Sequence, residues 1–79
     1  MKQELEQSLK DFMAKSEKLE NLIKDLDTTI TNLKTAHPAY GAIQKLEFMH
    51  HDLTRSRKDT LDIIRMIENK LDKDFENNG

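Results

Sequence analysis

The chain has 79 residues but no cysteine and no tryptophan, and glycine and proline are scarce, with two and one residues. Without thiols there can be no disulfide, no thiolate metal site and no thiol nucleophile. Phosphate-binding loops and many oxyanion holes are built from glycine-rich segments, and a chain with so few glycines contains no such segment. This composition favours long helices over a fold with many turns.

The chain also has no large excess of either charge, because its 13 basic and 15 acidic residues give a net charge of −2. The two signs are interleaved, which is typical of a solvated helical surface, so we expect no nucleic-acid partner. No apolar run approaches the roughly 20 residues that span a bilayer, and residues 1–10 lack the apolar core of a signal peptide. We therefore expect a cytoplasmic protein without a membrane partner, and export by a route that uses no cleaved signal stays open as the alternative.

The most regular feature of the sequence is a ladder of positions whose steps alternate between four and three residues. A mean step of about 3.5 is typical of a helix that keeps one narrow stripe against a second helix in a left-handed supercoil. The pattern predicts a helix from about residue 2 to about residue 35 that packs on one partner helix. The positions of the ladder are Leu5, Leu9, Phe12, Ser16, Leu19, Ile23, Leu26, Ile30 and Leu33.

A break separates this helix from the rest of the chain. Pro38 has no N–H and disfavours helical geometry at His37, which predicts a turn over about residues 36–40. Pro38 also suits the start of a second helix, predicted from about residue 39 to 76, with a frayed tail at 77–79. A break this short sends the second helix back antiparallel to the first. The predicted fold class is all-α: one coiled-coil-like, antiparallel two-helix hairpin over residues 1–79, within a dimer, a four-helix bundle or a hetero-complex.

The second helix has its own seam, which is apolar at both ends and polar in the middle. Its apolar members are Ile43, Leu46, Leu53, Ile64 and Leu71, and its polar members are His50, Arg57 and Thr60. Folding the chain near Pro38 pairs positions whose numbers sum to about 77. The polar segments 14–18 and 54–60 then meet, and we expect the hairpin to be loosest there, at the level of Ser16.

The second helix also carries more apolar residues than one seam can use. Near the turn these are Tyr40, Phe48 and Met49. Near the C-terminus they form the predicted partner interface, which consists of Leu61, Ile63, Met66, Ile67 and Phe75, although Ile67 also follows the seam spacing. Two helices alone have no third layer, so the entropy of ordering them nearly cancels the gain from burying their seam. We therefore expect a protein partner, either a second copy of the chain or another helical protein.

Acidic and histidine side chains offer one possible metal site. Glu47 and His50 share one face of the second helix, and Asp27 should lie at their level across the hairpin. Di-iron sites in helical bundles use Glu-x-x-His pairs of this kind. A helix rich in glutamate produces such a pair by chance, however, and we expect no metal.

Basic and hydroxyl side chains point to no catalytic site. The segment 55–58 holds Arg55, Arg57 and Lys58, but aspartates flank it on both sides. A small anionic ligand near Arg57 and Thr60, between copies of the hairpin, stays open as an alternative. Ser16 and Thr60 have no histidine at their level in the hairpin, so we expect no catalysis and no cofactor.

The order of aliphatic residues resembles that of a known family. Glu4-Leu5-Glu6 lies at the start, Leu26, Ile30 and Leu33-Lys34 precede the break, and Leu61-Asp62-Ile63-Ile64 and Leu71 follow it. This arrangement is similar to the small hairpin co-chaperones of type III secretion systems, the YscE-type proteins, over nearly the whole chain. The resemblance implies a cytoplasmic chaperone or adaptor that joins a second, helical-repeat chaperone and holds a needle subunit monomeric before export.

Two other kinds of small helical protein share parts of the pattern. Needle subunits also have a helix, a proline-containing turn and a second helix, but they usually carry a Pro-x-x-Pro turn that residues 37–40 do not contain. Phage-encoded hairpins that oligomerise and sequester cyclic nucleotides resemble residues 42–47. The main prediction is a non-catalytic module that docks a protein through its second helix. The alternative is a small self-assembling protein, either needle-like or nucleotide-sequestering.

Overall fold

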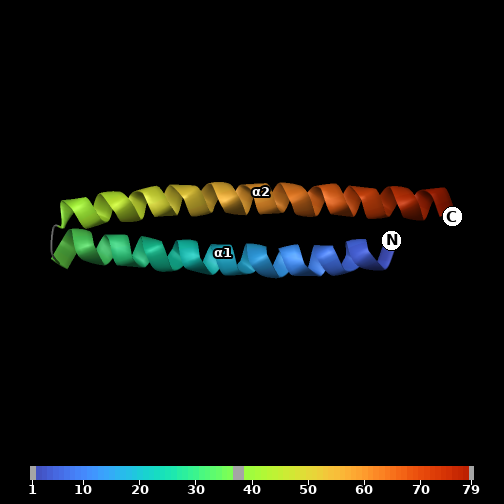
Figure 1. Cartoon of the computed structure of the whole chain (residues 1–79). Helices are drawn as coiled ribbons and strands as arrows, with labels where there is room; N and C mark the ends of the chain where they lie inside the picture. Colours follow the sequence, from blue (N-terminus) through green and yellow to red (C-terminus); the bar gives the residue numbers. More distant parts are fainter. Residues whose placement is uncertain (1, 37–38, 79) are drawn as a thin grey trace.

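The structure is a computed structural model that describes residues 2–36 and 39–78, with side chains up to residue 73. It consists of two helices, α1 (Lys2–Ala36) and α2 (Tyr40–Asn78), with no strand in the described residues. The helices lie side by side and antiparallel, so the start of α1 and the end of α2 are at the same end of the rod (Figure 1). The predicted all-α hairpin is confirmed.

The helix ends follow from local chemistry. Glu4 lies in the first turn of α1 and Lys34 in its last turn, where each charge complements the helix dipole. The carbonyl of Ala39 accepts a hydrogen bond from the N–H of Ile43 at 2.9 Å, which positions Ala39 just before the first turn of α2. His37 and Pro38, on which the predicted turn depends, lie outside the described residues.

The boundaries of α2 differ slightly from the prediction. The helix begins at Tyr40 rather than at residue 39. It continues to Asn78 rather than ending at residue 76, so residues 77 and 78 are helical instead of forming a frayed tail. Residue 79 lies outside the described part of the chain.

The hairpin is a rod with a large surface. It measures 60 × 14 × 14 Å, and its radius of gyration is 17.9 Å. A compact domain of this length has a radius of gyration of about 12 Å. The accessible surface is 6451 Å², whereas a compact monomer of the same mass exposes about 5,000 Å². The fold therefore leaves an unusual amount of its surface in contact with water.

The core lies in the seam between the two helices. All thirteen apolar residues predicted for the seam are buried or half-buried. The most buried of them are Ile30 and Ile43, which are 8% and 7% exposed, and no described side chain falls below 2%. A core this thin is what two helices without a third layer can form.

The polar middle of the seam combines two buried hydroxyl side chains with an adjacent cavity. Ser16 and Thr60 are 8% and 9% exposed, as buried as the two isoleucines. Small side chains let two helices approach each other, and the Thr60 hydroxyl donates a hydrogen bond to the carbonyl of Ser56 at 2.8 Å within its own helix. A cavity lined by Met13, Ser16 and Leu61 nevertheless opens at the same level, in line with the loose packing expected there.

Candidate interaction surfaces

Ion pairs join α1 to α2 along one flank of the hairpin. They link Lys34 Nζ with Glu47 Oε1 at 3.2 Å, Asp27 Oδ1 with His50 Nε2 at 2.8 Å, and Glu20 Oε2 with Arg57 Nη2 at 3.7 Å. The residue numbers sum to 81 in the first pair and to 77 in the other two, which confirms the predicted register. These six residues define what we call the ionic flank.

The ion pairs of this flank contribute more to the alignment of the two helices along each other than to the stability of the fold. The side chains of Arg57 and Glu20 are 37% and 46% exposed, and ion pairs in such contact with water contribute about 0–1 kcal/mol each. His50 carries a charge only when protonated, and neither His50 Nε2 nor Arg57 Nε has a hydrogen bond of good geometry although both are buried. His50 Nε2 and Asp27 Oδ1 are nevertheless 2.8 Å apart, so the two side chains are in direct contact across the hairpin.

The same pairs separate the residues of the possible metal site. Glu47 is held by Lys34 across the hairpin, while Asp27 contacts His50. Across the described residues, no group of three histidine or carboxylate side chains converges on a point that could hold a metal ion. Glu47 and His50, the two residues of the Glu-x-x-His spacing, thus contact different residues of α1 and do not form one site.

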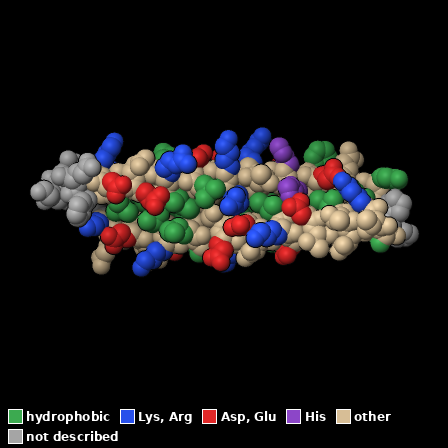
Figure 2. All heavy atoms as spheres, turned by 180° about the vertical axis from the view of Figure 1, so that it is seen from behind, with side chains coloured by type: hydrophobic (Ala, Val, Ile, Leu, Met, Phe, Trp, Pro, Cys, Tyr) green, Lys and Arg blue, Asp and Glu red, His purple; other side chains and the backbone are tan. Residues whose placement is uncertain are grey.

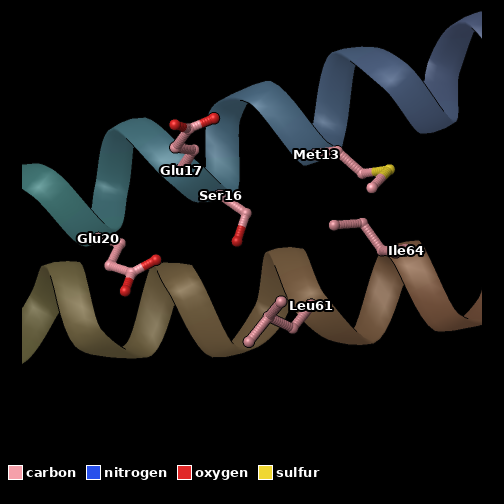
Figure 3. Close-up of a pocket in the computed structure, with 6 residues that line it drawn as sticks. All are labelled: Met13, Ser16, Glu17, Glu20, Leu61 and Ile64. Carbon is pink, nitrogen blue, oxygen red and sulfur yellow. The ribbon is translucent and has the colours of Figure 1, made fainter.

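A cavity of about 280 Å³ opens beside the ionic flank, further from the turn. Figure 3 shows the Ser16 hydroxyl directed toward α2 and the Met13 and Ile64 side chains approaching each other across the gap. Carboxylates line one part of the cavity and aliphatic side chains the other: its residues are Met13, Ser16, Glu17, Glu20, Leu61 and Ile64. No histidine, lysine or arginine lies among them to act with Ser16, so these residues offer space for packing rather than a set for catalysis.

The residues predicted for the partner interface do not share one face. Leu61 and Ile63 are two positions apart, which turns their side chains about 160° from each other around α2. Leu61 lines the cavity beside the ionic flank, whereas Ile63 and Met66, three positions apart, lie on the other side of the helix. Ile67 is half-buried, in keeping with its seam spacing. The side chain of Phe75 lies outside the described residues.

The flank opposite the ionic one is formed by two stripes of residues spaced by seven. On α1 the stripe is Ser8, Lys15, Leu22, Thr29 and Ala36, and on α2 it is Ala42, Met49, Ser56, Ile63 and Lys70. On α1 the stripe lies across the seam from the paired residues Glu20, Asp27 and Lys34, and on α2 it lies across the seam from Glu47, so the two stripes meet on the far side of the hairpin. We call this surface the smooth flank, because none of its ten residues is acidic and half of them are small.

Exposed apolar side chains are concentrated on α2. Among the side chains that the structure describes, eight large hydrophobic ones are exposed, and α1 contributes two of these, Met13 and Leu22. The six from α2 are Tyr40, Phe48, Met49, Leu61, Ile63 and Met66. Figure 2 shows one side of the rod, where hydrophobic side chains gather between the helices toward the free ends and charged side chains surround them.

Neither helix, over its described residues, has a stretch both long and apolar enough to cross a membrane. No family model, no curated protein and no solved structure matches the chain. What the molecule binds is therefore inferred from its own surfaces.

Proposed function

We propose that the chain is a non-catalytic interaction module that binds a protein partner through the apolar side chains that α2 leaves exposed. The supporting observation is the unequal exposure of the two helices. Tyr40, Phe48 and Met66 of α2 are 79%, 63% and 68% exposed. Burying one such side chain fully contributes about 1.5–3 kcal/mol, so several of them along one helix make a strong binding surface.

The spacing of these side chains indicates the shape of the partner. Phe48 and Met66 are 18 residues apart, which is five helical turns, so they point in nearly the same direction and lie about 27 Å apart. Between them the same face of α2 carries Asp52, Arg55 and Asp59. A helix laid along α2 with two apolar anchors and basic residues between them fits this surface.

Within this class, the proposed role is that of a small cytoplasmic chaperone or adaptor. The order of aliphatic residues resembles that of the needle co-chaperones of type III secretion. An exposed helical face with apolar anchors covers the apolar face of an amphipathic client and thereby keeps the client from associating with itself. The client is then an amphipathic helical protein prone to assembly.

The proposal is tested by removing the two anchors without touching the seam. The variant carries Phe48→Glu and Met66→Glu, and the matched control carries Gln44→Glu and Asn69→Glu, which add the same charge at other exposed positions of α2. Tagged chains are expressed in the cells that make the protein, and captured proteins are quantified by mass spectrometry. We expect at least one protein to be captured by both the native chain and the control. Its captured amount should be at least about tenfold lower with the variant.

Circular dichroism must show the same helicity for the native chain, the variant and the control, so that a difference in capture reflects binding and not unfolding. Equal capture by the variant and the control would overturn the assignment of α2 as the docking helix. Absence of any specifically captured protein would overturn the interaction module itself.

A further inference from the structure

We propose that the smooth flank is where two copies of this chain meet, packed antiparallel as a four-helix bundle. The bundle is related by a two-fold axis that passes at the level of Leu22 and Ser56. This proposal goes beyond the proposed function, because it concerns a different surface from the line between Phe48 and Met66 and a different occupant.

The first argument is the area left exposed by one hairpin. Its accessible surface of 6451 Å² exceeds that of a compact monomer by about 1,500 Å². A stable interface between two proteins of ordinary size removes about 800 Å² from each partner. One further layer of two helices, packed on one flank, removes an area of this size and provides the third layer that the thin core lacks.

The second argument is the shape of the smooth flank. Its large apolar side chains are Leu22, Met49 and Ile63, which are 49%, 52% and 37% exposed. Small residues separate them along both stripes: Ser8, Thr29, Ala36, Ala42 and Ser56. Small side chains between the large ones let the helices of a second copy approach closely enough for the large apolar side chains of the two copies to meet. The opposite side of the hairpin also exposes Met13 and Leu61, but the ion pairs of the ionic flank place charges of both signs along it.

The third argument decides the direction in which the copies pack. The observed register puts Leu22 level with Ser56, and Met49 and Ile63 each lie seven residues from Ser56. A two-fold axis at this level places Ile63 over the second copy's Met49 and the two Leu22 side chains against each other. Every large apolar residue of the smooth flank thus meets another one.

Charge favours the same direction. Lys15 and Lys70 lie toward the same end of the smooth flank, away from the turn. In the antiparallel bundle the two copies of Lys15 are 14 residues apart in level, or about 21 Å, well beyond the Debye length of about 8 Å at physiological salt. A parallel bundle would bring the two copies of Lys15 to the same level. Repulsion therefore selects the antiparallel arrangement.

Sedimentation equilibrium over a wide range of concentration tests the dimer. We expect the native chain to have twice its monomer mass of 9.3 kDa. Leu22→Glu should raise the dissociation constant at least about tenfold, because it places two carboxylates together at the two-fold axis. Met13→Glu is the matched control, since Met13 is 54% exposed on the same helix but on the opposite flank, and it should remain dimeric.

Cross-linking tests the direction and does not depend on a disruptive substitution. The chain has no cysteine, so single cysteines can be joined by a short bismaleimide. We expect Leu22→Cys to form cross-linked dimers with itself, and Ile63→Cys to react with Met49→Cys in a mixture but not with itself. Self-reaction at Ile63→Cys without the mixed product would overturn the antiparallel arrangement.

A native chain that stays monomeric at all concentrations would overturn the dimer, as would a dimer that Leu22→Glu leaves intact while Leu22→Cys fails to cross-link. Either result is distinguishable from failure of the proposed function, because the capture experiment replaces Phe48 and Met66, which are not members of the smooth flank. A dimer that captures no protein supports the bundle alone.

Discussion

The two buried isoleucines allow a quantitative test of what holds the hairpin together. Ile30→Ala removes three carbons from a side chain that is 8% exposed, and at about 0.8 kcal/mol per carbon the loss is about 2.4 kcal/mol. Alanine favours the helix over isoleucine by about 0.4 kcal/mol. Water can fill the space beside a two-helix seam, so we expect the cavity to add little. The net loss is about 2 kcal/mol.

Thermal unfolding followed by circular dichroism measures this loss. For 79 residues the entropy of unfolding is about 0.17 kcal/mol per kelvin, so a loss of about 2 kcal/mol lowers the Tm by about 12 °C. The matched control is Phe48→Ala, which removes a larger apolar side chain that is 63% exposed outside the seam. Its Tm should stay within about 3 °C of the native value. A fall as large for Phe48→Ala as for Ile30→Ala, or no fall for either, would refute the seam as the source of stability.

Three further substitutions probe the backbone and the seam. Gly41→Ala should raise the unfolding free energy by about 0.5–1 kcal/mol in urea titrations, because an added Cβ at this helical position meets no atom within 4 Å; a loss of stability would show that the first turn of α2 needs glycine. Thr60→Val should leave the urea midpoint nearly unchanged, because the hydroxyl bonds only within its own helix, to Ser56. A loss above about 1 kcal/mol would mean that this hydroxyl stabilises the seam. Leu26→Asp places a carboxylate in the seam beside Asp27 and should abolish most of the helicity measured by circular dichroism; native-like melting would contradict the position of Leu26.

The seam and the register were predictable because they depend on spacing along the chain. A seven-residue repeat brings the same stripe of a helix to its neighbour throughout its length, so residues from Leu5 to Leu33 could be assigned without knowing the partner. A short break then leaves one antiparallel register, and the contact between Asp27 and His50 follows from it. Both features are local consequences of helix geometry.

The packing of the polar level was not predictable from polarity alone. A cavity opens at the level of Ser16, yet the Ser16 and Thr60 side chains are themselves buried. The hydrogen bond from Thr60 to Ser56 satisfies the Thr60 hydroxyl without a partner from α1. Burial of a polar side chain depends on such local bonds, which spacing does not reveal.

The sequence alone did not show that the residues of the predicted docking face point to different sides of α2, because this depends on how the two helices pack together. Leu61, Ile63 and Met66 are close in sequence, but the position of the ionic flank decides which of them face the cavity and which face away. The seven-residue spacing of Met49, Ser56 and Ile63 was present in the sequence and could have indicated the smooth flank. This spacing could be assigned to a flank only after the ion pairs had identified the opposite flank of the hairpin.

Association between helices is what this chain is proposed to be for, and native mass spectrometry of the protein purified from the cells that make it measures this most directly. We expect two copies of the 9.3 kDa chain bound to one further protein, with no added mass from a nucleotide or a metal; two copies alone would support the bundle but contradict the docking role of α2. A helical 9.3 kDa monomer without a partner would contradict the proposal, as would a complex whose additional mass is a small ligand.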